Sequence, residues 1–220
     1  MNKISKLIVS TVIGALCVVS LAACSSNDTS ANASSTASTS GSSTNTEVDD
    51  GLLHGIHHAE IVVQDYGTIY VELDGDTAPI TVTNFVDLAN SGFYDNLTFA
   101  RVIEGFMIQG GDPNGDCTGT AENSIKGEFS YNGVENNISH KRGTISMARG
   151  KKYNSASCQF FICNADAESL DGQYAAFGWV TDGMDIVDAI TKDCAGHTNY
   201  NGVITDKNLQ PIITTINIID

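Results

Sequence analysis

Three segments of the chain place aromatic and polar side chains next to one another. They cover residues 99–112 (FARVIEGFMIQGGD), residues 143–166, where GTISMARG is followed closely by SASCQFFICNAD, and residues 170–180 (LDGQYAAFGWV). An arginine in such a setting stays charged and presents several N–H donors. A GxSxG elbow, a P-loop and a dinucleotide fingerprint do not occur in the sequence. The sequence therefore lacks the residues that hydrolases and nucleotide-binding proteins usually contain.

These segments resemble the cyclophilin family of peptidyl-prolyl cis-trans isomerases. The resemblance extends from the first predicted strand to the C-terminus, and its motifs are long, in the family's order and correctly spaced. It implies a mainly β fold, a closed eight-stranded antiparallel barrel capped by two α-helices. It also implies an isomerase whose substrates are proline-containing polypeptides, with no cofactor and no metal.

The resemblance also implies a site, residue by residue. Arg101, Phe106 and Gln109 match the family's catalytic residues. The positions that match substrate-binding residues are Met107, Ala148, Arg149, Gln159, Phe161, Leu170 and Tyr174.

The chemistry of this reaction explains why such residues suffice. Rotation about an Xaa–Pro bond meets a barrier of about 18–20 kcal/mol, because resonance stiffens the amide. No covalent bond breaks, so the enzyme has only to bind the twisted amide better than either planar form. Twisting localises a lone pair on the prolyl nitrogen, and the charged Arg101 can donate to it. We expect Gln109 to hold the guanidinium and donate to the substrate carbonyl, and the main chain of Arg149 to clamp the peptide.

Four positions depart from the common family pattern. Ala100 stands where many members have His, Ser169 where they have Trp, and Tyr174 where they often have His. Arg149 replaces the Asn of a frequent SMAN segment. We expect activity with an altered substrate and inhibitor profile, and the missing Trp argues against tight cyclosporin binding.

Other polar clusters have simpler interpretations. HGIHH at residues 54–58 lacks a Cys or carboxylate at metal-ligand spacing, so we interpret it as a solvated lead-in to the first strand. The run from Asp112 to Thr118 imitates a calcium loop but has Cys117 where Gly is required, which favours a turn. His140 and His197 have no obvious nucleophile partner, and each is interpreted as a surface or capped histidine.

The elements that must position the site follow from hydrophobic periodicity. Runs of β-branched and aromatic residues predict short strands. They are AEIVVQ, TIYVEL, TFARVI, FMIQGG, GTISMAR, CQFFICN, AAFGWV and PIITTINII. Helical spacing after Pro79 and again over residues 184–191 predicts two helices. Many short strands with only two helices favour a closed or nearly closed antiparallel sheet.

The N-terminus has the features of an export signal. Two lysines precede an uncharged run over residues 7–21, and Leu21-Ala22-Ala23-Cys24 resembles a bacterial lipobox. We expect residues 1–23 to be a lipoprotein signal peptide. Cys24 is the predicted site of lipidation, palmitate included, which would anchor the protein in the cell membrane on its extracytoplasmic face.

A tether is expected after this cysteine. Of the 23 residues from 25 to 47, 14 are Ser or Thr, too polar to offset backbone entropy by burial. The predicted organisation is a disordered tether over residues 24–53 and an isomerase domain over residues 54–220.

Composition and charge limit the partners of the domain. Hydrophobic residues make up 41% of the 220 residues and charged residues 17%, which excludes a chain disordered throughout and a polytopic membrane protein. The net charge is −15, so nucleic acid, whose binding needs Lys and Arg, is not an expected partner. We expect a monomer.

Four cysteines follow the predicted lipid site, and their pairing stays open. An exported location permits disulfides, but sequence cannot name a pair. Cys158 and Cys163 lie in an apolar run, where a free thiol behaves as a small hydrophobe. The other two are Cys117 and Cys194.

The sequence leaves three functional hypotheses. The first is a lipid-anchored prolyl isomerase that assists the folding of exported proteins. The second is a proline-peptide-binding module or holdase chaperone with little turnover, and the third is an adhesion protein that displays an acidic barrel. Arg101 and Gln109 favour the first, because a pure binder has no need of that donor. A rate that varies little between about pH 6 and 8 is expected, because arginine does not titrate there.

Overall fold

The computed structural model describes residues 50–220. The predicted signal peptide, Cys24 and nearly all of the predicted tether lie outside the described residues. The lipidation and domain-boundary predictions are therefore not tested by the structure.

Eight strands and two α-helices form this part of the chain, as the periodicity predicts. The strands are β1 (Ile56–Val63), β2 (Gly67–Asp74), β3 (Phe99–Ile103), β4 (Met107–Gly110), β5 (Thr144–Met147), β6 (Phe160–Cys163), β7 (Ala176–Asp182) and β8 (Ile213–Ile218). The helices are α1 (Pro79–Asn90) and α2 (Met184–Cys194), and three single 3₁₀ turns lie between the strands and after α2. The mainly β prediction is confirmed.

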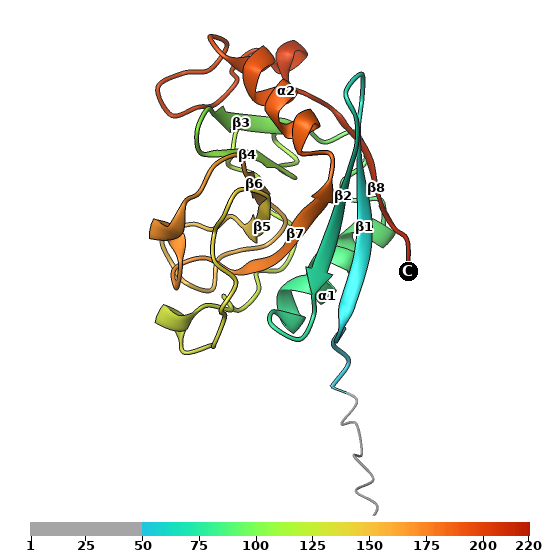
Figure 1. Ribbon diagram of the computed structural model, residues 1–220, viewed down its shortest axis with the longest axis vertical. Coiled ribbons are helices and arrows are strands. Elements are labelled where there is room, and N and C mark those ends of the chain that lie inside the picture. Colours follow the sequence, from blue (N-terminus) through green and yellow to red (C-terminus); the bar gives the residue numbers. More distant parts are fainter. Residues whose placement is uncertain (1–49) are drawn as a thin grey trace, which may run out of the picture. The chain divides into compact units, whose positions relative to one another are not determined.

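All eight strands belong to one antiparallel sheet. Its order is β3-β4-β6-β5-β7-β2-β1-β8, so β3 and β8 are the outer strands. Figure 1 shows the sheet curling round so that β1, β2 and β8 face the shorter strands β3 to β6. The long β1–β2 hairpin is in register over its whole length, from Ile56 opposite Asp74 to Val63 opposite Gly67.

The sheet is an open, curled half-barrel, and the prediction of a closed barrel is wrong. No ladder joins β3 to β8 among the described residues; one bridge, between Thr98 and Ile212, lies just before the two strands. The outer edge of β3 is instead occupied by residues 202–204. Val102 donates to the carbonyl of Gly202 at 2.8 Å, and the amide of Ile204 donates to the carbonyl of Ala100 at 2.9 Å. The two outer strands meet only where they begin: the amide of Phe99 donates to the carbonyl of Pro211 at 2.9 Å, and the amide of Ile213 donates to the carbonyl of Leu97 at 2.7 Å.

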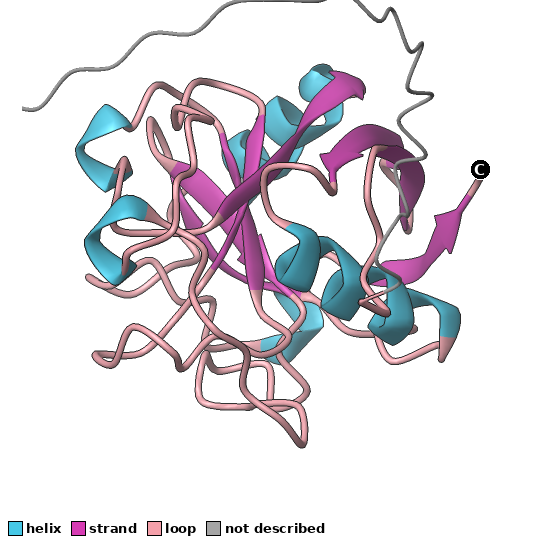
Figure 2. Ribbon diagram, turned by 90° about the horizontal axis from the view of Figure 1, so that it is seen from below, coloured by secondary structure: helices cyan, strands magenta, loops and turns pink. Residues whose placement is uncertain are grey.

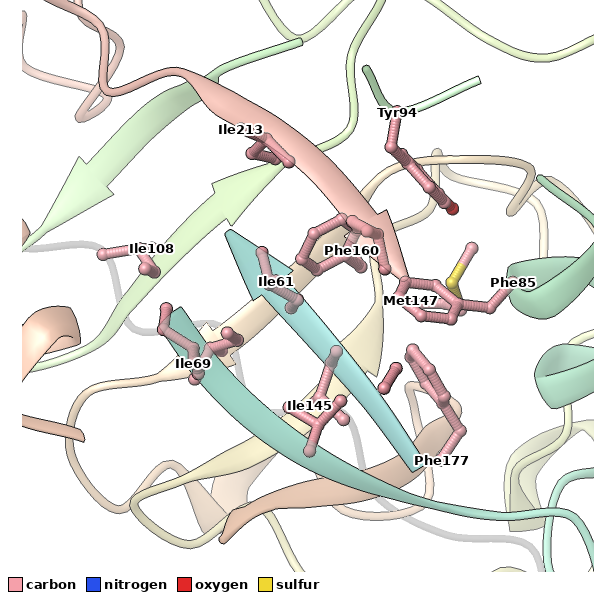
Figure 3. Close-up of a cluster of buried hydrophobic side chains, with 14 of the residues drawn as sticks. Ile61, Ile69, Phe85, Tyr94, Ile108, Ile145, Met147, Phe160, Phe177 and Ile213 are labelled. Atoms are coloured by element: carbon pink, nitrogen blue, oxygen red, sulfur yellow. The ribbon is translucent and has the colours of Figure 1, made fainter. Parts of the chain in front are cut away.

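Alternation along the strands divides the apolar side chains between the two faces of the sheet. On β6, Phe160 and Ile162 enter the main core, whereas Phe161 and Cys163 belong to a separate cluster with Met107. The main core lies inside the curled sheet, where Figure 3 shows side chains from the strands and from α1 converging. The second cluster lies on the other face and becomes the floor of the site described below.

The two helices cover opposite ends of this core, as Figure 1 shows. Helix α1 starts at Pro79 and buries one face, which includes Phe85. Its first turn has no cap from its own N-terminal residue; instead the buried Glu128 accepts hydrogen bonds from the amides of Ile80 (3.1 Å) and Thr81 (2.8 Å). Neither helix has the length and apolar content to cross a membrane.

Long loops and short helical turns form much of the remaining surface (Figure 2). One of them is the predicted turn after β4. The buried carboxylate of Asp112 accepts hydrogen bonds from the amides of Asn114, Asp116, Cys117 and Gly119, which confirms a turn.

The histidine-rich segment lies differently from its prediction. His57 and His58 lie within β1, not ahead of it. Both rings hydrogen-bond to the carboxylate of Asp220, which ties the first strand to the end of the chain.

Candidate active site

A row of side chains crosses three neighbouring strands on the outer face of the sheet. Arg101 on β3 lies opposite Gln109 on β4, and Gln109 lies opposite Phe161 on β6. Directly opposed residues in a sheet have their Cβ atoms about 4.5–5.5 Å apart and share a face. The antiparallel register therefore brings together three residues that the sequence separates by up to 60 positions.

A hollow of about 490 Å³ opens above this row. All the predicted site residues except Gln159 line it: Arg101, Phe106, Met107, Gln109, Ala148, Arg149, Phe161, Leu170 and Tyr174. Gln159 lines an adjoining hollow of about 330 Å³, whose wall also contains Gln109, Ala148 and Arg149. The structure thus gathers the predicted residues at one place, while their individual roles stay predictions.

Arg101 is held in a fixed position at the side of the hollow. Its Nε donates to the carbonyl of Asn201 at 2.8 Å, and its Nη1 donates to Oε1 of Gln109 at 3.0 Å. Its Nη2 forms no hydrogen bond within residues 50–220, so an already oriented cation keeps free donors, which is the condition for electrostatic preorganisation.

Gln109 links Arg101 to the interior of the sheet. Its Nε2 donates to Oε1 of Gln159 at 2.8 Å, and Nε2 of Gln159 donates to the carbonyl of Gly119 at 2.7 Å. The prediction that Gln109 holds the guanidinium is confirmed by this geometry. One of its two amide hydrogens is used by Gln159, so donation to a substrate carbonyl depends on the other.

The floor of the hollow is apolar and tightly packed. Met107 and Phe161 are only 1% and 4% exposed, and Phe106, Leu170 and Tyr174 pack against them. A pyrrolidine ring is small and apolar, so a floor of this kind with a charged donor at its side suits it.

Tyr174 and Arg149 form a further part of the rim of the hollow. The ring of Tyr174 meets the ring of Phe161 edge-on, with centroids 6.0 Å apart. The guanidinium carbon of Arg149 lies 4.6 Å from the centre of the Tyr174 ring. These contacts keep the rim side chains in place beside the floor.

Cys117 also lines the hollow, a place that no sequence pattern predicts for it. Burial, followed by the nearby carboxylate of Asp112, raises the pKa of its thiol to about 11. A thiol in that state is protonated at neutral pH and a poor nucleophile. The four cysteines of residues 50–220 are all free.

The sequence predicts His140 to be a surface or capped histidine; it is not at the surface, and both of its ring nitrogens have hydrogen-bond partners. It is 1% exposed; Nδ1 lies 2.8 Å from Oδ1 of Asp171, and Nε2 lies 3.0 Å from Oγ of Ser146. This is the order of a hydrolase triad, but Ser146 is completely buried, so no acyl substrate can reach its oxygen. The ring instead stacks behind Phe161, with centroids 5.9 Å apart and planes 15° from parallel.

Asn201, whose main-chain oxygen holds Arg101, is a further residue of the site that no sequence pattern predicts. A carbonyl has no residue-type signature, and the two residues lie 100 positions apart. For His140, the deduction from sequence failed because its partners, Ser146 and Asp171, become neighbours only through the β5–β6 pairing and the turn after Leu170.

A family model described as cyclophilin type peptidyl-prolyl cis-trans isomerase/CLD matches residues 58–217. The chain belongs to this family. It is thus a cyclophilin-type enzyme, and the isomerase activity expected from the sequence is the activity of its named relatives.

Curated relatives support the assignment. Peptidyl-prolyl cis-trans isomerase A of Dickeya dadantii is 46% identical over 132 residues, which cover 57% of this cyclophilin and 67% of the relative. The Helicobacter pylori enzyme is 44% identical over 126 residues, covering 56% and 74% of the two chains. Isomerase B of Escherichia coli is 41% identical over 145 residues, covering 62% and 86%.

Solved structures agree on the fold. A cyclophilin-type isomerase of Cryptosporidium parvum superimposes with a TM-score of 0.66 at 29% identity, covering 76% of this chain and 99% of that one. The same protein crystallised in the presence of the dipeptide Ala-Pro gives a TM-score of 0.65 at 30% identity, covering 74% and 99%.

Proposed function

We propose that this cyclophilin accelerates rotation about Xaa–Pro bonds of exported proteins at the outer face of the membrane, by non-covalent stabilisation of the twisted amide. The observation that carries the proposal is the fixed guanidinium of Arg101 beside the apolar floor formed by Met107 and Phe161. Proline-containing polypeptides are the proposed substrates, and the Ala-Pro dipeptide used with the C. parvum relative supports that choice.

Arg101 is the proposed source of catalysis. In the planar amide the nitrogen lone pair is delocalised into the carbonyl, whereas in the twisted amide it can accept a hydrogen bond. A guanidinium donor near this nitrogen binds the twisted form more strongly than either planar form, and only such differential binding raises the rate. Because Asn201 and Gln109 already orient Arg101, little reorganisation accompanies the reaction.

The other predicted residues bind and hold the substrate. The proline ring would rest on Phe106, Met107, Phe161 and Leu170. Ala148, Gln159 and the main chain of Arg149 would hold the peptide on one side of the rotating bond while the other side turns. Tyr174 would close the rim and offer its hydroxyl.

The proposed location rests on the sequence of residues 1–24. A lipidated Cys24 followed by a polar tether would keep the domain, as a monomer, near the point where exported chains emerge. Slow Xaa–Pro exchange limits the folding of such chains, so an isomerase held there would act where it is needed.

A proline-peptide-binding module or holdase with little turnover is the alternative. It would use the same apolar floor but would gain nothing from the preorganised guanidinium. Removing the guanidinium of Arg101 by mutation therefore distinguishes the two hypotheses.

The test is cis/trans exchange of an Ala-Pro peptide, followed by NMR so that no coupled protease is needed. Residues 48–220 are suitable, because the sheet, both helices and the core all lie within residues 50–220. We expect the wild type to accelerate exchange and Arg101→Ala to lose about 100-fold or more, the usual effect of removing a transition-state donor. Arg142→Ala, an exposed arginine paired with Asp188, is the control and should keep full activity. If the wild type binds the peptide but does not accelerate exchange, only the hypothesis of a binding module or holdase remains.

A further inference from the structure

Several cations without carboxylate partners come from the segments next to Arg149, which lines the groove. Elsewhere, Lys141 pairs with Glu168, and Arg142 donates twice to Asp188 at 2.8 Å. The other seven Lys and Arg residues of the described part form no ion pair with a carboxylate, and four of them come from two short segments, at residue 126 and at residues 149–152. We call them the cationic rim: Lys126, Arg149, Lys151 and Lys152.

These residues come from two segments that lie against each other. The amide of Gly127 donates to Oδ1 of Asn154 at 3.1 Å, and Ile125 pairs with Ala156. Residue 126 therefore lies beside the loop that follows Arg149. The three lysines are exposed, whereas Arg149 is half-buried at the edge of the groove.

Arg149 is fixed without being neutralised. Its guanidinium carbon lies 4.6, 5.2 and 5.3 Å from the ring centres of Tyr174, Tyr153 and Phe129. Its Nε donates to the carbonyl of Gln173 at 2.8 Å, and its Nη1 donates to that of Gly150 at 3.0 Å. No hydrogen bond within residues 50–220 uses its Nη2, so two N–H donors of a preoriented cation stay available.

Arg149 lies next to the path that a bound peptide would follow through the groove. Arg149 lines both the main hollow and the adjoining hollow that contains Gln159. An extended peptide advances about 3.3 Å per residue, so a residue within two positions of a proline in the main hollow comes within reach of Arg149. Asp116 also lines the main hollow; its carboxylate accepts hydrogen bonds from Thr118, which lower its pKa and keep it charged.

We propose that the cationic rim makes this enzyme prefer proline-containing segments with an acidic residue within two positions of the proline, with Arg149 as the main specificity-determining residue. The proposal rests on the proposed function, because it assumes that the proline ring occupies the main hollow. A carboxylate would pair with the open edge of the guanidinium, the geometry that arginine favours.

The preference is a short-range one. The whole chain carries −15 and repels acidic peptides at a distance. At an ionic strength of about 0.15 M the screening length is about 8 Å, so this repulsion is weak while direct contact with Arg149 persists.

The experiment compares peptides that carry Glu, Gln or Lys at each position within two residues of an Ala-Pro bond. Both kcat/KM from NMR exchange and Kd from chemical-shift titration are measured at about 0.15 M salt. At one position at least, we expect the Glu peptide to have a kcat/KM about three- to tenfold higher than the Gln peptide, as for one charge-assisted hydrogen bond. The Lys peptide should have the lowest kcat/KM. Arg149→Gln should give the Glu and Gln peptides the same kcat/KM, and Arg149→Lys should keep part of the difference between them. Lys192→Gln, on exposed α2 surface, should keep the whole difference.

The proposal is overturned if the wild type treats Glu and Gln alike at every position, or if Arg149→Gln keeps the wild-type ratio. Its failure can be told apart from that of the proposed function. A wild type that accelerates exchange of every peptide equally remains an isomerase without this preference. If it accelerates none, the proposed function fails, and the Kd values alone decide whether acidic peptides are preferred.

Discussion

At the residue scale, His140 is held in one tautomer by its two partners. A carboxylate can only accept, so Nδ1 carries the proton that Asp171 binds, and Nε2 accepts from the hydroxyl of Ser146. Burial lowers the pKa of His140, although Asp171 opposes that effect. The neutral ring therefore acts as a rigid support behind Phe161, on which the floor of the site depends.

A pH dependence of folding stability follows from this burial. The unfolded chain binds a proton near the ordinary histidine pKa of 6.5, while the folded chain resists it. Protonation thus favours unfolding, so the contribution of His140 is complete above about pH 6.5 and is lost as the pH falls below it. Urea unfolding of the wild type between pH 7.5 and 5.5 should show this loss.

Two variants isolate the effect. His140→Gln should be less stable than the wild type at pH 7.5 by about 1–3 kcal/mol, because buried partners lose their hydrogen bonds. Its free energy of unfolding should also decline less steeply towards pH 5.5. The exposed His197→Gln should follow the wild-type profile. Parallel profiles for the wild type and His140→Gln would show that His140 does not cause the pH dependence.

At the element scale, the loop over residues 199–204 covers part of the outer edge of β3. It pairs with β3 and at the same point presents the carbonyl of Asn201 to Arg101. Gly202 allows this approach: its φ is +84°, and an added Cβ would lie 2.3 Å from Cγ1 of Ile103. The same loop thus covers the edge of β3 and holds Arg101 in place.

Substituting this glycine tests the link between loop and site. Gly202→Ala should push the loop off β3, and we expect the isomerisation rate to fall about tenfold, as when one hydrogen bond to a charged group is lost. Gly196→Ala is the matched control, since its φ is +85° and no atom lies within 4 Å of the added Cβ. Both variants carry the same backbone strain, so Tm should fall in both, whereas the rate should fall sharply only in Gly202→Ala. Equal rates would show that the loop does not position Arg101.

At the scale of the whole molecule, an acidic chain depends on a covalent anchor to stay at a membrane. A charge of −15 gives no attraction to an anionic lipid surface. Buried acyl chains contribute about 0.8 kcal/mol per methylene, so two or three chains are enough for stable attachment.

Lipidation can be tested at Cys24. In cells fed labelled palmitate, Cys24→Ser should lose the label and leave the membrane fraction, because the nucleophile for acylation is gone. Cys17→Ser, inside the apolar run, should keep both label and location. A Cys24→Ser protein that is still labelled and membrane-bound would refute this anchor.

The sequence by itself determined the elements and the composition of the site. Alternation and helical spacing depend on neighbours a few residues apart, so eight strands and two helices could be predicted from them. The long motifs around Arg101, Phe161 and Tyr174 carried enough family resemblance to predict which residues meet.

Only the tertiary structure decided how the sheet ends, what holds Arg101, and why His140 is buried. Each depends on contacts between distant segments, such as Arg101 with the carbonyl of Asn201. A main-chain carbonyl is the same for every residue type, so the sequence has no signal for such a contact. Likewise, whether the edge of β3 meets β8 or residues 202–204 is a competition between two long-range pairings, which local hydrophobic pattern cannot resolve.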